Sequence, residues 1–361
     1  MTPDGARARP SRRLAPEVLL ARLAAAVDQA FPGAEVRELR QVSGGASSLT
    51  YSAVLTGVGT SPRACFVKVA PAGLEPVRNR DVVRQAALQA LLAEDGRIPV
   101  PEILLVDAGD PPDSPPLYVS GAVEGESLEP LVDREPAFPA ADVLTGRTLA
   151  AGAVLARLHE VDVEWVAGLP AAGPAGVDLG GEVDRWARVF STVDPELAEV
   201  GEQCAERLRR QLPEALAPAV VHGDFRLGNL ICAGAAVRAV LDWEIWSITD
   251  PRIDLAWFLM TLAHDGLPSA VRTAAPGLPG PAVALAEYER ARGAVMPDMA
   301  WFGSLSRFRA AAAMALNVKH NRRRPEPDPA IERYAETLVP FLRAGVALLE
   351  DDVHVARSRV I

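Results

Sequence analysis

The chain has 361 residues, of which 49% are hydrophobic and 23% are charged, a composition typical of a globular protein with a substantial core. It carries 37 basic and 47 acidic side chains, a net charge of −10, and lacks the basic surplus that nucleic acid requires. No uninterrupted apolar run approaches the roughly 20 residues that span a bilayer. These features exclude a disordered chain, and we expect neither nucleic acid nor a membrane as a partner.

The cysteines and the N-terminus indicate a cytoplasmic protein. Three cysteines (Cys65, Cys204 and Cys232) are odd in number and far apart, which fits a reducing compartment and gives no disulfide framework. The Arg-rich start lacks the apolar core of a secretory signal peptide, and we expect residues 1–15 to form a disordered tail. The five histidines show no spacing typical of metal ligands.

The hydrophobic pattern predicts a β-rich first part of the chain. An amphipathic helix is predicted over Pro16–Phe31, and a second helix over Val77–Glu94, which Gly96 ends. Apolar stretches of strand length predict five strands: Val36–Val42, Leu49–Thr56, Ala64–Val69, Glu102–Val106 and Leu117–Val119. A glycine- and serine-rich segment, residues 43–48, is predicted as the turn between the first two strands.

After Gly121 the pattern becomes almost wholly helical, with one compact interruption between residues 219 and 254. The predicted helices are 141–160, 182–191, 195–212, 281–293, 298–318 and 329–349. Two short strands are predicted in the interruption: Leu230–Cys232 and Ala236–Leu241. Five strands with one main helix, followed by a helical part, predict an α+β protein with two lobes. We expect the N-lobe to span residues 16–119 and the C-lobe residues 120–361.

The interruption contains a spacing that suits phosphoryl transfer. It reads HGDFRLGNL over residues 222–230, and the next predicted strand is followed by Asp242. This is the kinase catalytic-loop spacing H-x-D-x-x-x-x-N, followed by a strand and a second aspartate. A carboxylate beside a reactive hydroxyl group can accept its proton, while an asparagine and a second carboxylate supply oxygen ligands for Mg²⁺. Each residue alone is common in turns, but the joint match indicates a kinase-type site.

These motifs resemble those of the aminoglycoside phosphotransferase family, the small-molecule branch of the kinase-like fold. The resemblance covers residues 35–345 and is carried by HGDFRLGNL (222–230) and LDWEIWSITDPRIDL (241–255), while FVKV (66–69) is similar to the phosphate-binding strand. In their residues, the motifs are most similar to the branch whose relatives form the kinase-like part of certain acyl-CoA dehydrogenases. The resemblance implies a two-lobed protein-kinase-like fold. The small N-lobe would hold a five-stranded antiparallel sheet and one main helix, and the larger C-lobe would be mostly helical.

The resemblance also assigns roles to the motif residues. Asp224 would be the catalytic base, Arg226 would lie beside the transferred phosphate, and two residues would hold Mg²⁺: Asn229 and Asp242. Lys68 would bind the α- and β-phosphates of ATP or GTP, and it is one of only two lysines among the 37 basic residues. The other residues expected to bind the nucleotide are Gly44, Gly45, Ser47, Ser48, Ser120 and Ala122.

Residues around the motif are expected to support it. Asp254, which opens a helix, would brace the catalytic loop, and His222 would be packed and hydrogen-bonded. Three tryptophans nearby are expected in the core: Trp243, Trp246 and Trp257.

The chain departs from the family pattern in the helix after Lys68. The family places a glutamate after an arginine there, to pair with the lysine, whereas here Arg84 is followed by Gln85. We expect either that Glu75 or Asp81 takes the place of that glutamate, or that Lys68 lacks a carboxylate partner. In the second case its pKa falls, because burial disfavours an unpaired ammonium.

The acceptor is expected to be a small hydroxylated molecule. Only the interval 242–254 separates the two aspartates of the second motif, too short for the activation segment on which protein kinases dock a peptide. Antibiotics, amino alcohols and hydroxyacyl compounds all stay open. The acidic surplus, which lies after residue 120, favours a cationic acceptor. The residues of the motifs, which resemble the acyl-CoA dehydrogenase branch, favour a hydroxyacyl compound instead.

Two other classes of function, a binding module and a hydrolase, fit parts of the pattern. A nucleotide-binding module without turnover is favoured by Gln85 but opposed by the intact Asp224, Asn229 and Asp242. A glycosidase pair of aspartates leaves Asn229 and Lys68 unexplained, and a two-metal phosphoesterase needs more histidine ligands. We therefore predict an ATP- or GTP-dependent, Mg²⁺-dependent small-molecule O-phosphotransferase, with the catalytically impaired module as the alternative.

Overall fold

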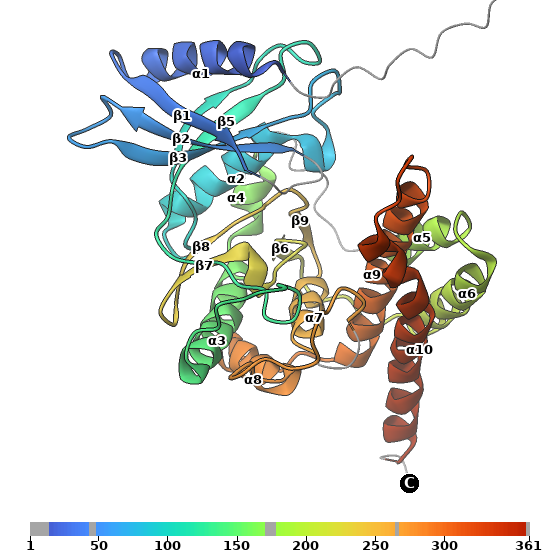
Figure 1. The fold of residues 1–361 in the computed structure, drawn as a ribbon. Helices are drawn as coiled ribbons and strands as arrows, with labels where there is room; N and C mark the ends of the chain where they lie inside the picture. Colours follow the sequence, from blue (N-terminus) through green and yellow to red (C-terminus); the bar gives the residue numbers. More distant parts are fainter. Residues whose placement is uncertain (1–13, 43–47, 170–177, 264–266, 359–361) are drawn as a thin grey trace, which may run out of the picture. The chain divides into compact units, whose positions relative to one another are not determined.

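A computed structural model of the protein, shown in Figure 1, describes residues 14–42, 48–169, 178–263 and 267–358. The chain divides into two compact units. The first unit consists of Met1–Glu124, Gly168–Ala172 and Ala239–Ile245. The second unit consists of Gly125–Ala167, Gly173–Arg238 and Trp246–Ile361. The sequence placed one boundary near residue 120, whereas the structure also assigns the distant segment 239–245 to the first unit.

The first unit is built on a five-stranded antiparallel sheet. Its strands, in spatial order, are β1 (Glu35–Gln41), β2 (Leu49–Thr56), β3 (Arg63–Val69), β5 (Leu117–Gly121) and β4 (Ile103–Asp107). Side chains of β2 alternate between buried and half-buried, the period of a strand with one face in a core. Helix α1 (Pro16–Ala30) covers this face and buries Leu19, Leu23 and Val27, which recur every four residues (Figure 1).

The opposite face of the sheet packs against α2 (Val82–Asp95). Val82 and Ala86 of this helix contact Tyr118 of β5. Lys68 of β3 is the cross-strand neighbour of Tyr118, so it lies on the same face, because side chains on one face recur with period two. The sheet therefore directs Lys68 toward the side of α2.

Capping residues set the ends of α2. The carboxylate of Asp81 accepts the backbone N–H of Arg84 at 2.9 Å, so the helix begins after Asp81 and not at residue 77, where the pattern placed it. Arg78–Arg80 form a separate 3₁₀ turn, η1. Gly96 adopts a left-handed conformation with φ of 71° and ends the helix, as expected.

The second unit is mainly helical, as predicted. Its helices are α3 (Ala141–Leu158), α4 (Val163–Ala167), α5 (Leu179–Phe190), α6 (Pro195–Arg210), α7 (Arg252–Thr261), α8 (Pro281–Arg292), α9 (Met299–Asn321) and α10 (Pro329–Ser358). Helix α9 contributes most to the core of this unit, where Phe308 stacks on Phe190 of α5 with ring centroids 4.9 Å apart. No helix in the described parts of the chain is both long and apolar enough to cross a membrane.

Two short β-pairs carry the motif residues. Strand β6 (Ala219–Val221) pairs with β9 (Ser247–Thr249), and β7 (Leu230–Ala233) pairs with β8 (Ala236–Val240). The β7–β8 hairpin was predicted, whereas β6 and β9 were not, because three residues are too few to show a strand period. The chain passes from the second unit into the first near the end of β8, at Ala239.

Candidate active site

The predicted catalytic loop, residues 222–229, follows β6 in the second unit and is braced by Asp254. The backbone N–H groups of His222 and Gly223 donate to the two carboxylate oxygens of Asp254, at 2.6 and 2.8 Å. Gly223 has φ of 90°, a conformation that favours glycine, and the chain turns there. Asp254 lies in the first turn of α7 and is fully buried, as is His222. The brace expected from the sequence is therefore present.

Hydrogen bonds compensate the buried charge of Asp254. Burial acts to raise the pKa of Asp254, but the neighbouring His159 and His222 and the backbone N–H of His222 outweigh burial and lower it. Nε2 of His159 lies 3.6 Å from Oδ2 of Asp254, and its Nδ1 lies 2.6 Å from the hydroxyl oxygen of Tyr288. An ionised carboxylate thus fixes the backbone where the catalytic loop begins.

Three donors orient the carboxylate of Asp224, the predicted base. Its Oδ1 accepts the indole N–H of Trp257 at 2.8 Å. Its Oδ2 accepts the side-chain amide of Asn229 at 2.9 Å and the guanidinium of Arg226 at 3.3 Å. The side chain of Asp224 is 26% exposed, so part of the carboxylate stays open to a ligand. Trp257 packs against the core of the second unit, as expected, but it is only partly buried and its indole N–H also holds the proposed base.

Asn229, a predicted metal ligand, is buried at the end of the 3₁₀ turn η2 (Leu227–Asn229). Its amide nitrogen donates to the backbone carbonyl of Asp224 at 2.8 Å as well as to the carboxylate. Because the nitrogen is used within the loop, the carbonyl oxygen Oδ1 is the atom that suits a cation. Among the described residues, no group of three or more His, Cys, Asp or Glu side chains could hold a metal ion.

A buried glutamate that no motif marks anchors Arg226. Oε2 of Glu129 accepts the guanidinium of Arg226 at 3.0 Å and the backbone N–H of Gly228 at 2.9 Å. Burial raises the pKa of Glu129, although Arg226 opposes this shift. The only signal in the sequence is one acid in an apolar segment, residues 128–131 (LEPL). Glu129 therefore positions Arg226 beside Asp224 and ties down the turn that follows.

In the first unit, Lys68 forms an ion pair with Asp242. Its Nζ donates to Oδ1 of Asp242 at 2.7 Å, and the side chains of Lys68 and Asp242 are 12% and 41% exposed. Burial acts to lower the pKa of Lys68, but Tyr118 and Asp242 outweigh burial and raise it. The condition for a lowered pKa, an ammonium without a carboxylate partner, is therefore not met. The partner comes from the second motif and not from α2.

Asp242 occupies an unusual backbone conformation. Its φ is 62°, in the left-handed region that few residues other than glycine adopt, although aspartate is among those that tolerate it. Such a conformation costs about 1–3 kcal/mol and persists where surrounding contacts enforce it. The backbone N–H of Val240 donates to the carbonyl of Pro99 at 2.8 Å, which attaches this segment to the first unit. The turn thus presents the carboxylate of Asp242 to Lys68.

Gln85 is fully buried in α2, but the hydrogen bond that its side chain donates goes to η1 and not to a group beside Lys68. Nε2 of Gln85 donates to a backbone carbonyl of η1 at 3.2 Å, and its Oε1 has no hydrogen-bond partner in the described parts of the chain. Gln89, one turn later, donates to the hydroxyl group of Tyr118 at 3.3 Å. Asp81, considered above as a replacement partner, caps the helix instead. Gln89 therefore supplies the side-chain hydrogen bond from α2 to the sheet, at Tyr118.

The other residues predicted to bind the nucleotide are described only in part. Three of them lie outside the described residues: Gly44, Gly45 and Ser47. Ser48 is buried directly before β2, and Ser120 is buried within β5. The backbone N–H of Ala122 donates to the carbonyl of Ala64 in β3 at 3.0 Å, so this N–H is already hydrogen-bonded within the protein. The nucleotide contacts of these residues stay predictions.

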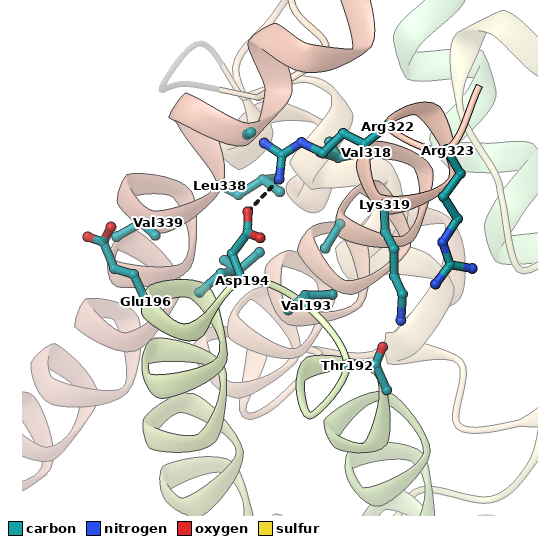
Figure 2. Close-up of a pocket in the computed structure, with 13 residues that line it drawn as sticks. Thr192, Val193, Asp194, Glu196, Val318, Lys319, Arg322, Arg323, Leu338 and Val339 are labelled. Carbon is teal, nitrogen blue, oxygen red and sulfur yellow. Dashed lines mark hydrogen bonds and ion pairs between the residues drawn. The ribbon is translucent and has the colours of Figure 1, made fainter. Parts of the chain in front are cut away.

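A cavity of about 360 Å³ lies elsewhere in the second unit, where the α5–α6 turn meets the end of α9 and the start of α10 (Figure 2). Leu197 and Leu338 contribute to its apolar lining, and Lys319 adds a cation. Arg322 donates to Asp194 at 2.7 Å across this cavity, as Figure 2 shows. None of the predicted site residues lines it.

Comparison with known proteins gives the same classification. The model of the phosphotransferase enzyme family matches residues 38–302. Acyl-CoA dehydrogenase family member 10 of Mus musculus is 28% identical over 224 residues, which cover 61% of this chain and 20% of that protein. Acyl-CoA dehydrogenase family member 11 of Gallus gallus is 30% identical over 227 residues, 61% of this chain and 27% of that protein. The chain spans at most about a third of the length of the curated relatives it matches.

Solved structures of similar fold are phosphotransferases. A putative aminoglycoside phosphotransferase from Ralstonia eutropha gives a TM-score of 0.75 at 21% identity, and the match covers 94% of this chain and 99% of that one. Aminoglycoside 2'-phosphotransferase-IIIa, solved as a GDP complex, gives 0.59 at 15% identity, with 92% and 98% covered. These similarities confirm the kinase-like fold that the sequence predicted.

Proposed function

Because the chain belongs to the phosphotransferase enzyme family, we propose that it transfers the γ-phosphoryl group of ATP or GTP to a hydroxyl group of a small molecule. The observation that carries the proposal is the carboxylate of Asp224, which three donors hold in a loop braced by Asp254. Phosphoryl transfer depends mainly on positioning and electrostatics, and three donors position this carboxylate while 26% of the side chain stays exposed.

Asp224 is the general base of the proposed reaction. The acceptor's hydroxyl oxygen forms a bond to the γ-phosphorus, the bond to the β–γ bridging oxygen breaks, and the hydroxyl proton passes to Asp224. Arg226 places a permanent positive charge beside this centre, because Glu129 and Asp224 together hold its guanidinium. Burial acts to lower the pKa of Arg226, but Asp224 and Glu129 outweigh it and raise the pKa. The charge offsets that of the transferred group.

Lys68 is the proposed contact to the nucleotide phosphates. An ammonium has three donors, and the hydrogen bond to Asp242 uses one of them, so donors remain for phosphate oxygens. The neighbour solved as a GDP complex, and an aminoglycoside phosphotransferase solved with ADP and hygromycin B, support a purine nucleotide as the donor. They support ATP and GTP equally.

Asn229 and Asp242 are the proposed Mg²⁺ ligands, each offering the oxygen donor that this ion prefers. The amide nitrogen of Asn229 donates within the loop, so the amide oxygen is the atom that would bind the ion. Asp242 is 41% exposed, and its Oδ2 is not the atom bonded to Lys68. When bound with the nucleotide, the ion neutralises phosphate charge.

A catalytically impaired nucleotide-binding module is the alternative, and Gln85 is the observation that favours it. The chain also corresponds to only a part of relatives that are named acyl-CoA dehydrogenases, so their names do not transfer an activity to it. The contacts of Asp224 oppose this alternative, because a module without turnover has no need of an oriented carboxylate.

The test is an assay of ADP or GDP release with Mg²⁺ and a panel of hydroxy acids, amino alcohols and aminoglycosides such as kanamycin. We expect at least one class to raise nucleotide consumption by about tenfold or more above the rate in water alone. Mass spectrometry should then identify a phosphate monoester of that compound. Calorimetric nucleotide binding without transfer to any class would support the impaired module and contradict the proposal.

A further inference from the structure

Arg309 of α9 is a buried cation whose partners are incomplete. The residue belongs to the second unit, and its side chain is 9% exposed. Nε lies 3.2 Å from Oε1 of Glu182 but has no hydrogen bond, and Nη1 has neither a hydrogen bond nor an ion pair in the described part of the chain. A guanidinium carries five N–H donors and stays charged in proteins. Among the described residues, Arg309 is therefore a buried charge with one nearby carboxylate and two nitrogens that make no hydrogen bond.

Glu182 does not compensate Arg309 fully, because the oxygen nearest Arg309 already accepts two other donors. Oε1 of Glu182 accepts the indole N–H of Trp186 at 2.8 Å and the guanidinium of Arg185 at 2.9 Å. Burial lowers the pKa of Arg309, and the attraction of Glu182 does not cancel this shift. An unpaired buried charge is destabilising unless something else serves it. The ion pair between Arg309 and Glu182 joins α9 to α5 through Nε. It gives no role to Nη1, which makes no hydrogen bond in the described part of the chain.

The position of Arg309 connects it to the proposed base. Its guanidinium carbon lies 6.0 Å from the ring centroid of Trp186 and 5.9 Å from that of Trp257. Trp257 is also the residue whose indole N–H holds Oδ1 of Asp224 at 2.8 Å. Both indoles are partly exposed. One side chain, Trp257, thus contacts both the buried cation and the carboxylate that would receive the acceptor's proton.

We propose that Arg309 binds an anionic group of the acceptor, a carboxylate or a phosphate, while the acceptor's hydroxyl group lies at Asp224. The inference rests on the proposed function and names its substrate class. A guanidinium with unused N–H groups matches the two oxygens of such an anion. The indoles of Trp186 and Trp257 offer flat apolar surfaces for the carbon chain between the two ends. The net charge of −10 pointed toward a cation, whereas the incompletely paired guanidinium of Arg309 favours an anion.

The test compares acceptors that differ only in charge. Linear hydroxy acids are assayed beside their amides and beside amino alcohols of the same length, and glycerol 3-phosphate beside glycerol. We expect the anionic member of a pair to have a kcat/KM at least about tenfold above that of the neutral member, mainly through KM. The pair that shows this ratio tells whether the anion is a carboxylate or a phosphate.

Three variants assign the preference to Arg309. Arg309→Gln should bring the ratio of anionic to neutral acceptor close to one, while nucleotide affinity stays unchanged. Arg309→Lys keeps the charge with fewer donors and should retain part of the ratio, and it serves if the glutamine variant fails to fold. Arg290→Gln, an exposed arginine on α8 paired with Glu287, is the matched control and should keep the full ratio.

Calorimetry of the same anions without nucleotide separates this inference from the proposed function. Saturable binding that Arg309→Gln abolishes, without phosphoryl transfer to any compound, would support the anion site and contradict the transferase. Transfer with the same ratio in wild type and Arg309→Gln would overturn the anion site and leave the transferase standing. A preference for amino alcohols or kanamycin, or no saturable binding of any anion, would also overturn the anion site.

Discussion

Lys68 and Asp242 form an ion pair across 174 residues of sequence, with Nζ 2.7 Å from Oδ1. The proposed phosphate-binding cation and a proposed metal ligand therefore neutralise part of each other's charge. The nucleotide and its ion would bind the remaining donors of Lys68 and Oδ2 of Asp242, which the pair does not use. The pair would compete with the ligand for these charges, so its strength would set part of the nucleotide affinity.

Replacing Lys68 should weaken nucleotide binding. Lys68→Met keeps the apolar stem and removes the charge, and a hydrogen bond to a charged group contributes about 1.5–3 kcal/mol, so Kd should rise by about tenfold to a hundredfold. Calorimetry with ATP, GTP and Mg²⁺ measures this change. Lys319→Met removes the other lysine of the chain and is the matched control. Equal Kd values for the two variants would remove Lys68 from the nucleotide site.

Removal of Mg²⁺ should weaken the nucleotide complex by about tenfold or more, because Asn229 and Asp242 would act through the ion. Titration of ATP with and without EDTA measures this difference. The Asn229→Ala and Asp242→Ala variants should bind nucleotide with little dependence on Mg²⁺. An EDTA-independent affinity in the wild type would contradict the metal assignment.

Loss of Asp224 should affect turnover and not nucleotide binding. Asp224→Ala removes the proposed base, and kcat on the acceptor found in the screen should fall by on the order of 10²–10⁴. Nucleotide Kd should change less than about twofold, since phosphates are not the proposed partners of this carboxylate. Steady-state kinetics beside Asp142→Ala, an exposed acid at the start of α3, checks this. A kcat equal to that of the control would sink the role of Asp224.

Asp254 should contribute to stability at neutral pH. Asp254→Asn replaces an ionised acceptor of two buried N–H groups by an amide that can accept only one of them, so the free energy of unfolding should fall by about 2–4 kcal/mol. Urea unfolding measures this change. Asp162→Asn is a matched control, because Asp162 accepts the N–H of Glu164 at 2.9 Å on the exposed surface.

The contribution of Asp254 should also depend on pH. Its pKa is lowered in the folded protein, so its stabilisation is present above the ordinary value of 3.8 and is lost as pH falls through the lower folded value. Asp254→Asn should therefore lose less stability than the wild type when the pH is lowered from about 5 to about 2. Parallel acid slopes for the two proteins would show that Asp254 is not ionised in the folded state.

The three cysteines should be unreactive in the folded protein. All three are buried and unpaired with one another, and burial raises the pKa of Cys65 to about 11 and that of Cys204 to about 11. Little thiolate is present at about pH 8, and thiolate is the reactive form. We expect no reaction with an aromatic disulfide reagent until guanidinium unfolds the chain. Rapid labelling of the native protein would contradict this.

The sequence predicted well those features that depend on residues close together in the chain. The alternation in β2 and the four-residue period of α1 fix each element from its own residues. The spacing from His222 to Asn229 likewise indicated the loop, and the helix-opening Asp254 indicated its brace. These relationships span few residues or follow a known motif.

What the sequence did not reveal depends on contacts between distant segments. Glu129 lies 97 residues from Arg226, and the pairing of Lys68 with Asp242 joins two motifs that local patterns treat separately. Trp257 and Arg309 look like ordinary core residues until tertiary packing brings one to Asp224 and the other to an incomplete ion pair. The periodicity of hydrophobic residues does not distinguish a buried arginine that has an unused N–H group from one whose N–H groups are all hydrogen-bonded.

The assignment of residues 239–245 to the first unit has a consequence for biosynthesis. The sheet, α1 and α2 are translated by residue 124, but the segment that carries Asp242 follows more than a hundred residues later. At about 5–20 residues per second, the ribosome leaves Lys68 without its carboxylate for several seconds. The first unit therefore cannot complete its fold until the segment 239–245 has been synthesised.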